Sequence, residues 1–347
     1  MAAVAERKNN TAGVVRLEQV RKGQSLWMDA WMRLRRNRAA VLGMIIIVLA
    51  ILAALFAPVI APRHYARQVL VDNNAAPEWV THVFTNMLPK EDGGYVTINN
   101  SYVLGADALG RDILSRILYG ARISLAVAFI GPAVSMGIGL SFGLIAGYVG
   151  GRTDNILMRI VDVMYAFPTL LLIILMMTFF RSSFSDRTPG TIAYSLGKLD
   201  AAFGGMLFII IGIGITSWMQ MARLTRGQVL AEREKEYIQA AHAIGTRTPR
   251  IMWNHVLPNI LGPIIVAETL TIPSYILTEA FLSFIGLGVQ APTPSWGAMI
   301  NEGAQAIRSY PNQALFPAMA LFFIMFAFNF LGDGLRDALD PRMRGVD

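Results

Sequence analysis

The sequence has few charged residues and no cysteine. Only 15% of its 347 residues are charged and 54% are hydrophobic, whereas soluble domains contain about 25% charged and roughly 45–50% apolar residues. A membrane protein is therefore the first expectation. The lack of cysteine excludes disulfide bonds and thiolate metal sites.

The motifs of ATP binding and of common hydrolases are also absent. The sequence contains no G-x-x-x-x-G-K-[ST] loop, no H-E-x-x-H and no G-x-S-x-G. The four histidines lack the spacing of metal ligands. We therefore expect a chain that is not an enzyme and that binds no ATP, metal or other cofactor by itself. Any transport must then draw its energy from an ion gradient or from a partner.

Six apolar windows are long enough to cross a membrane core of about 30 Å, which takes about 20 helical residues. They cover residues 39–60, 123–149, 160–180, 203–221, 260–285 and 315–331. Segments that span lipid are helical because their backbone groups find no water there. The sequence therefore predicts an all-α, multi-pass membrane protein with six transmembrane helices.

The basic residues predict how these helices are oriented. Most Lys and Arg residues lie before the first window, after the second and fourth, and after the sixth. Basic residues concentrate on the cytoplasmic side of membrane proteins, so both termini are expected in the cytoplasm. The net charge of +7 then reflects topology, and we expect no nucleic-acid partner.

The segments between the windows suggest a division of the chain. Trp27, Trp31 and Leu34 share one face of an amphipathic helix that is expected to lie in the cytoplasmic interface. A second surface helix, around residues 113–118, is expected to lead into the second span. The predicted parts are a disordered leader (1–22), the interfacial helix with the first span (23–62), an extracytoplasmic segment (63–119), five further spans (120–335) and a cytoplasmic tail (336–347).

Small residues recur at every fourth position of the second window. They are Gly131, Ser135, Gly139, Gly143 and Gly147. A stripe of small residues allows another helix to approach closely in lipid. We expect tight helix packing here, either within this chain or against a second subunit, and the lining of a substrate path is the alternative.

The loop 223–259 contains an unusually polar stretch, EYIQAAHAIGTRTPRIMWNHVLPN. An apolar stripe at helical spacing is formed by Tyr237, Ala240, Ala241 and Ile244. Gly245 suits the left-handed end of a helix, Thr248 and Pro249 suit the start of a second one, and Pro258 suits the start of the fifth span. Such a short helix is marginal alone in water. It must therefore dock either on a partner or on this protein's own cytoplasmic face. The residues of the helix do not decide between these two alternatives.

This stretch resembles the E-A-A-x-x-x-G signature of binding-protein-dependent ABC importer permeases, with Gln239, Ala240, Ala241 and Gly245 at the matching positions. Residues 110–125, 146–159, 278–300 and 328–342 resemble the peptide and nickel branch of that family, in its second, C-type subunit. Residues 23–41 and 221–230 are most similar to the oligopeptide permease. The similarity covers nearly the whole chain after about residue 23. Gln239 stands where the family usually has glutamate, and Ala106 replaces the threonine of a G-T-D motif.

The resemblance implies the type I ABC importer fold, with this loop as a cytoplasmic coupling helix seated on an ATPase. The implied docking residues are Glu236, Tyr237, Gln239, Ala240, Ala241, Ile244, Gly245 and Pro258. The implied partners are a homologous second permease, two ABC ATPases that bind ATP and Mg, an extracytoplasmic substrate-binding protein, a peptide substrate and the lipid bilayer. The sequence does not decide the length of the peptide, or whether the cargo is a peptide, a nickel chelate or a modified peptide.

Two glutamates lie inside the fifth window. A charge at the bilayer centre costs about 2.5–3.5 kcal/mol, so Glu268 should face protein or water. It is expected either to contact a peptide amine or to bond a neighbouring helix, and the resemblance suggests a structural or gating role for Glu279. An ion-coupled transporter with Glu268, Glu279 or Asp162 as proton relays is the rival hypothesis, and a passive membrane anchor is a third.

Overall fold

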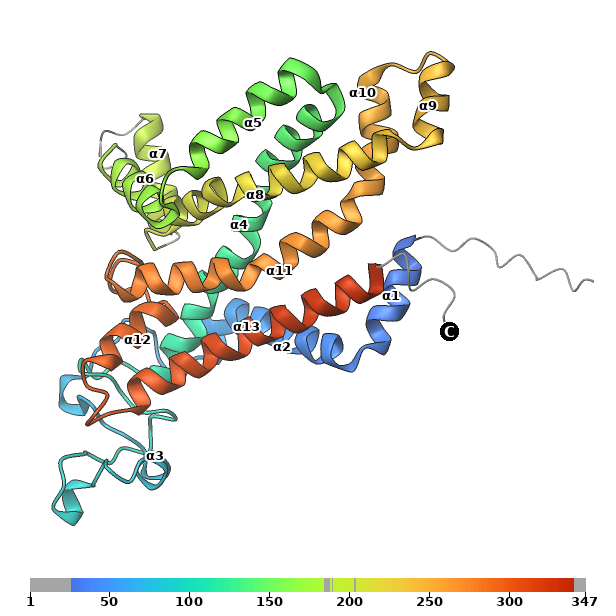
Figure 1. Cartoon of the computed structure of the whole chain (residues 1–347). Coiled ribbons are helices and arrows are strands. Elements are labelled where there is room, and N and C mark those ends of the chain that lie inside the picture. Colours follow the sequence, from blue (N-terminus) through green and yellow to red (C-terminus); the bar gives the residue numbers. More distant parts are fainter. Residues whose placement is uncertain (1–25, 184–187, 189, 203, 340–347) are drawn as a thin grey trace, which may run out of the picture.

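The computed structural model describes residues 26–183, 188, 190–202 and 204–339 (Figure 1). Within these residues the chain is an assembly of helices, with three isolated β-bridges between residues 76 and 112. The predicted leader, 1–22, lies outside the described residues, and so does most of the predicted tail. The expectation of an all-α protein is confirmed for the described part of the chain.

Five segments have the length and hydropathy to cross a membrane. They are α2 (Arg38–Ile60), α4 (Ile113–Val149), α8 (Leu207–Arg233), Thr248–Phe284 and α13 (Asn312–Leu339). A sixth crossing is made if the bent pair α5 (Gly151–Tyr165) and α6 (Thr169–Ser183) counts as one span. The number of crossings therefore agrees with the prediction only when this broken helix is included.

The third window is not the continuous helix that its hydropathy predicts. The chain bends by 88° between α5 and α6, at Ala166, Phe167 and Pro168. Pro168 has no backbone N–H and disfavours helical geometry at the residue before it, so the helix stops here and restarts at Thr169. Hydropathy alone does not register this break because all of these residues are compatible with lipid.

Other boundaries also differ from the predicted windows. The second predicted window began at Ile123, but the helix α4 begins ten residues earlier, at Ile113. The surface helix expected around 113–118 is therefore the first part of α4. Asp112 caps this helix by accepting a hydrogen bond from the backbone N–H of Ser115 at 2.7 Å. At the other end of the bundle, α8 continues as far as Arg233 and carries a polar extension beyond the predicted end at Met221.

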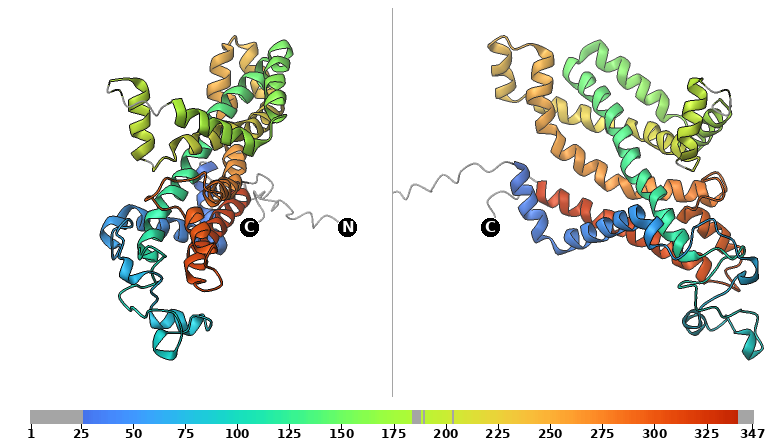
Figure 2. Two further views of the ribbon diagram at one scale, coloured as in Figure 1. Left: turned by 90° about the vertical axis from the view of Figure 1, so that its left-hand side faces the viewer. Right: turned by 180° about the vertical axis from the view of Figure 1, so that it is seen from behind.

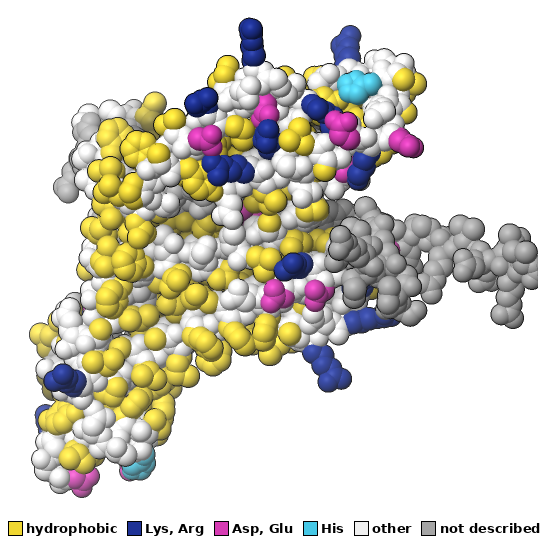
Figure 3. Space-filling view, in the orientation of Figure 1, with side chains coloured by type: hydrophobic (Ala, Val, Ile, Leu, Met, Phe, Trp, Pro, Cys, Tyr) yellow, Lys and Arg dark blue, Asp and Glu magenta, His cyan; other side chains and the backbone are white. Residues whose placement is uncertain are grey.

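Two ends of the bundle are distinct in the ribbon views (Figures 1 and 2). The helices α1 (Leu26–Arg36), α9 (Glu236–Ala243) and α10 (Thr248–Ile251) lie at one end, and α12 (Trp296–Ala304) and the segment 61–112 lie at the other. Figure 3 shows that charged side chains gather over α5 and α8 to α10, whereas hydrophobic side chains dominate the middle. This distribution suits a bundle that crosses a bilayer.

The helix α1 packs against protein with the face that holds Leu34. Ala30 and Leu34 form a buried cluster with Ala40 of α2 and Ala338 of α13, while Trp31 is 46% exposed. The amphipathic helix expected at the interface therefore also connects the beginning of α2 with the end of α13.

The segment 61–112 is folded. It contains η1 (Leu70–Asp72), α3 (Glu78–Val83) and η2 (Lys90–Asp92), and buried side chains of this segment pack with Tyr310 and Phe316 next to and within α13. The hydroxyl of buried Tyr102 donates to Asp72 Oδ2 at 2.9 Å. Burial and this hydrogen bond raise the pKa of Tyr102. The helix α7 (Ile192–Ala202) lies in the stretch between α6 and α8.

The helices α4 and α8 meet along the stripe of small residues. Gly143 is the tightest point, because a Cβ built there would lie 2.5 Å from the carbonyl oxygen of Ala222 and 2.5 Å from Thr225 Cβ. Gly139 faces Met221 and Gly147 faces Val229 in the same way. These three glycines therefore permit a backbone contact inside this chain. Gly131 lies near Tyr275 of α11 (Leu257–Phe284), and Ser135 is fully buried.

Replacing Gly143 by leucine should destabilise the protein, because the atoms it meets are mainly backbone and cannot move without separating α4 from α8. We expect a loss of about 1–3 kcal/mol, seen as a lower thermal unfolding midpoint in detergent. Gly137 on the same helix has nothing within 4 Å of a built Cβ, so Gly137→Leu is the matched control. Equal midpoints for the two variants would contradict this packing.

Candidate functional site

The polar loop after α8 folds as a short helix, a glycine turn and a second helix. The helix α9 ends at Ala243, and Gly245 then adopts φ +80°. The backbone N–H of Gly245 donates to the carbonyl of His242 at 2.9 Å, and that of Thr246 donates to Ala241 at 3.1 Å. Nothing lies within 4 Å of a Cβ built on Gly245, so glycine is required here by backbone conformation.

The second helix starts one residue earlier than predicted and runs into the membrane. Arg247 occupies the capping position, with Thr248 and Pro249 as the first helical residues. A π-helical turn, η3 (Met252–Val256), then joins α10 to α11 (Leu257–Phe284). Pro258 lies just after this turn, where its missing N–H removes one α-helical hydrogen bond. It does not start the span, because the helical segment is continuous from Thr248 to Phe284.

One face of α9 is seated on the ends of the long helices. Ile238 and Ala241 are buried in a cluster with Tyr148 of α4, Val229 of α8 and Ile260 of α11. Ile238 was not among the residues predicted from the sequence. Its position three residues before Ala241 was the available signal, but the stripe that begins at Tyr237 fits the helical period equally well.

Polar contacts tie both ends of α9 to three long helices. Tyr237 Oη donates a hydrogen bond to Glu232 of α8 and accepts one from Asn259 Nδ2 of α11 at 3.1 Å. The pKa of Tyr237 is raised by burial and by the bond to Glu232. Tyr148 Oη of α4 lies 2.8 Å from His242 Nε2. The short helix therefore cannot shift without moving at least one of these partners.

The opposite face of α9 is uncovered. Ile244 is 82% exposed and Tyr237 is 40% exposed, and Glu236, Gln239 and Ala240 are exposed as well. Of the four residues in the predicted apolar stripe, only Ala241 faces the protein's own core. We call α9, the turn at Gly245 and α10 together the elbow. The outer face of the elbow consists of Glu236, Tyr237, Gln239, Ala240, Ile244 and Gly245. Tyr237, Ala240 and Ile244 thus give this face an apolar stripe that the protein's own core does not cover.

Ion pairs brace the helices beneath the elbow. The guanidinium of Arg226 on α8 holds the Asp154 carboxylate of α5 with two hydrogen bonds, of 2.5 and 2.6 Å. Arg233 Nη1 donates to the carbonyls of Gly147 and Tyr148 at 3.4 and 3.2 Å. The ends of α4, α5 and α8 are thus held together where α9 is seated.

The two glutamates of the fifth window lie in separate surroundings on α11. Glu268 is 4% exposed and accepts a hydrogen bond from Tyr275 Oη at 2.7 Å. Glu279 is fully buried, with Ser283 Oγ at 2.8 Å and Ser124 Oγ of α4 at 3.5 Å. Asp162, in contrast, is exposed on α5 and pairs with Arg223 Nη2 at 2.6 Å. The structure therefore does not bring the three acids of the rival hypothesis together.

A largely buried ion cluster joins the segment 61–112, which we call the outer segment, to α4 and α12. Its one exposed member is Glu302, whose side chain is 42% exposed. Arg116 Nη1 contacts Asp107 Oδ2 at 2.5 Å and Glu302 Oε2 at 2.6 Å. Arg111 contacts the same two acids, at 2.6 and 2.7 Å. Asp107 belongs to the G-A-D motif noted in the sequence. The motif therefore anchors the outer segment despite the loss of its usual threonine.

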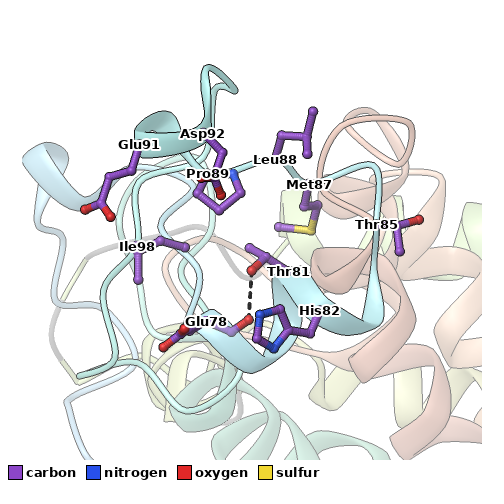
Figure 4. Close-up of a pocket in the computed structure, with 10 residues that line it drawn as sticks. All are labelled: Glu78, Thr81, His82, Thr85, Met87, Leu88, Pro89, Glu91, Asp92 and Ile98. Atoms are coloured by element: carbon purple, nitrogen blue, oxygen red, sulfur yellow. Dashed lines mark hydrogen bonds between the residues drawn. The ribbon is translucent and has the colours of Figure 1, made fainter.

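The outer segment also carries a hollow of about 760 Å³ (Figure 4). Acidic residues and a histidine face it, namely Glu78, Glu91, Asp92 and His82. Thr81 Oγ1 donates to the Glu78 carbonyl at 2.7 Å, which holds the first turn of α3. Among the described residues, no group of three or more His, Asp or Glu side chains is arranged to hold a metal ion.

Comparison with known proteins identifies the class. Residues 139–345 match the family of binding-protein-dependent transport system inner membrane components, and residues 25–77 match the N-terminal TM domain of oligopeptide transport permease C. The chain belongs to this family of inner-membrane transport permeases. It is accordingly a multi-pass inner-membrane protein and a transport subunit of the ABC importer type, as the resemblance implied.

Particular relatives are similar over nearly the whole chain. The oligopeptide transport system permease protein OppC of Bacillus subtilis is 40% identical over 93% of this chain and 92% of the relative. The dipeptide permease protein DppC of the same organism is 39% identical over 98% and 92%, and Escherichia coli OppC is 38% identical over 93% of each. A solved inward-facing methionine ABC transporter MetNI aligns with 64% of this chain and 97% of its own, at 18% identity and a TM-score of 0.47.

Removing a cation from the buried ion cluster should destabilise the outer segment. In Arg116→Met, the carboxylates of Asp107 and Glu302 lose a buried partner, and we expect a loss of about 2 kcal/mol or more. The measurement is the thermal unfolding midpoint in detergent. Arg67 is exposed in the same segment, so Arg67→Met should stay within about 0.5 kcal/mol of the wild type. Similar midpoints for both variants would show that the cluster contributes nothing to stability.

Proposed function

We propose that this chain is one of two dissimilar membrane subunits of an ATP-driven peptide importer. The peptide cargo is supported by the relatives, whose names specify oligopeptide and dipeptide transport, although glutathione transport is named for a further relative. A homologous second permease would complete the translocation path. Two ABC ATPase subunits would bind ATP and Mg, and a substrate-binding protein would deliver the cargo from outside.

The proposed topology has both termini and the elbow in the cytoplasm. Its support is that α1 packs on the last turn of α13, at the end of the bundle where α9 and α10 lie (Figure 1). The segment 61–112, α7 and α12 would then face the outside. We propose the domain division made from the sequence, with the second span extended back to Ile113 and the fourth extended to Arg233. The coupling loop is the segment 223–259 between the fourth and fifth spans.

The observation that carries the function is the two-sided character of α9. Its inner face, Ile238 and Ala241, is packed on α4, α8 and α11, while its outer face is uncovered. A partner that seats on the outer face can therefore move three long helices through one short one. We propose that the ATPases close on ATP binding, displace α9 and reorient the spans between inward-facing and outward-facing states.

The proton-coupled alternative finds less support. Asp162 is neutralised at the surface by Arg223, and Glu268 and Glu279 bond to different hydroxyl groups. None of the hydrogen bonds found in the described part of the chain joins the two glutamates. Uptake by the purified chain alone, in liposomes with a pH gradient, would favour the alternative, whereas the proposed importer gives no uptake without its ATPases.

A charge on the outer face of the elbow should uncouple ATP hydrolysis from transport. In Ile244→Glu the new carboxylate faces water and leaves the fold intact, since the residue is 82% exposed. Loss of this apolar anchor should lower peptide uptake by the assembled importer about tenfold or more. The measurements are ATP-dependent uptake in proteoliposomes and co-purification of the ATPases.

The control is Val71→Glu, because Val71 is 88% exposed at the other end of the molecule. It should leave ATPase binding unchanged. Ala241→Arg is a less direct test, since Ala241 lies in the chain's own core. Wild-type uptake and wild-type ATPase recovery in Ile244→Glu would overturn the proposed docking surface.

A further inference from the structure

Glu268 is a buried acid for which no cationic partner is found. It lies within the membrane-spanning segment Thr248–Phe284 and is 4% exposed. It takes no part in the ion pairs found among the described residues. An ionised carboxylate in this position costs several kcal/mol unless a cation or several hydrogen bonds meet it. A positive group placed beside the carboxylate would remove this cost.

The neighbours of Glu268 are hydroxyl groups. Tyr275 Oη donates to Oε1 at 2.7 Å, and Ser135 of α4 lies beside both residues. The Ser135 hydroxyl is fully buried and lacks a partner of hydrogen-bonding geometry. A carboxylate offers about four acceptor positions, so one firm hydrogen bond leaves most of its capacity unused.

A small cavity adjoins the carboxylate between α8 and α11. Its volume is about 40 Å³, and Ser217, Gln220, Thr271 and Tyr275 line it together with Glu268. In this measure of cavity volume one water molecule needs about 10–15 Å³, and an ammonium group is of similar size. The cavity therefore has room for an ammonium group together with about two water molecules. With one carboxylate and neutral oxygens, it lacks the ligand set of a divalent metal site.

A row of hydroxyl groups continues from this cavity toward the outer end of α11. Thr271, Ser274 and Thr278 each donate a hydrogen bond to a carbonyl of their own helix, at 2.7, 2.6 and 2.7 Å. Each oxygen therefore keeps a lone pair that can accept another bond. Ser274 is exposed and its two neighbours are half-buried. This row can accept hydrogen bonds from the amide N–H groups of an extended chain.

We propose that Glu268 receives the protonated amino end of a peptide in transit, with its ammonium group in the cavity between α8 and α11 and its backbone along the hydroxyl row. The inference rests on the proposed function and adds to it a recognition site for the free N-terminus. An amino group is the one cation that every unmodified peptide carries. A single carboxylate placed at the start of the row therefore suits substrates of varied sequence.

Glu279 supplies a matched control. It lies on the same helix and is also buried, but both of its carboxylate oxygens have a serine hydroxyl nearby. It is not among the residues that line the cavity. Replacement of either glutamate by glutamine keeps the shape and one accepting oxygen, removes the charge and turns the second oxygen into an NH2 donor.

The test measures ATP-dependent uptake by the complete importer in proteoliposomes, with its binding protein saturated by trialanine or by N-acetyl-trialanine. Glu268→Gln should lower trialanine uptake about tenfold or more. Acetylation should lower uptake by the wild type to a similar extent. Since both changes remove the same interaction, their combination should cost little more than either alone. Glu279→Gln should not distinguish the two peptides.

Three results would overturn the inference. Trialanine uptake at the wild-type rate in Glu268→Gln would show that the charge is not used. The second is that uptake of N-acetyl-trialanine by Glu268→Gln falls by the product of the two separate losses. Glu268 would then act on something other than the amino end of the peptide. Absence of ATP-dependent uptake of either peptide by the wild-type importer would remove the proposed function itself, and the inference with it.

Discussion

The close approach of α4 and α8 is the contact on which the rest of the structure depends. Gly139, Gly143 and Gly147 bring the two backbones together along the half of the bundle that carries α9 and α10. Lipid gives helices no hydrophobic reason to associate, so close van der Waals contact and polar ties must do so. The Arg226–Asp154 pair and the bonds from Arg233 then fix the ends of this helix pair. A firm platform results at the one place where a short water-facing helix is seated.

In the proposed mechanism, this platform would allow a helix of eight residues to transmit a partner's motion. Alone in water α9 would be marginal, but Ile238 and Ala241 anchor it in the core below, and Tyr237 and His242 bond to the helices around it. A load applied at the exposed Ile244 therefore reaches α4, α8 and α11 together. A loop that lacked these ties would deform locally and leave the membrane helices in place.

The sequence predicted the elements well and their faces less well. Hydropathy located the membrane helices because about 20 apolar residues have few other uses, but it missed the break at Pro168, where a backbone property decides and polarity does not change. Gly245 was predicted correctly as a left-handed residue, since only the local backbone matters there. The buried face of α9 was not predictable, because Tyr237 and Ile238 are both apolar and only the packing against α4, α8 and α11 selects between them.

The seat of α9 and the cavity beside Glu268 share side chains. Met221 and Leu224 of α8 pack in the cluster that holds Ile238 and Ala241, and the same two residues line the cavity. Met221 is also the side chain that Gly139 allows to lie against α4. One continuous cluster of packed side chains therefore links the proposed ATPase docking helix to the proposed peptide site. A movement of α9 that disturbs this cluster would reach the side chains that line the cavity.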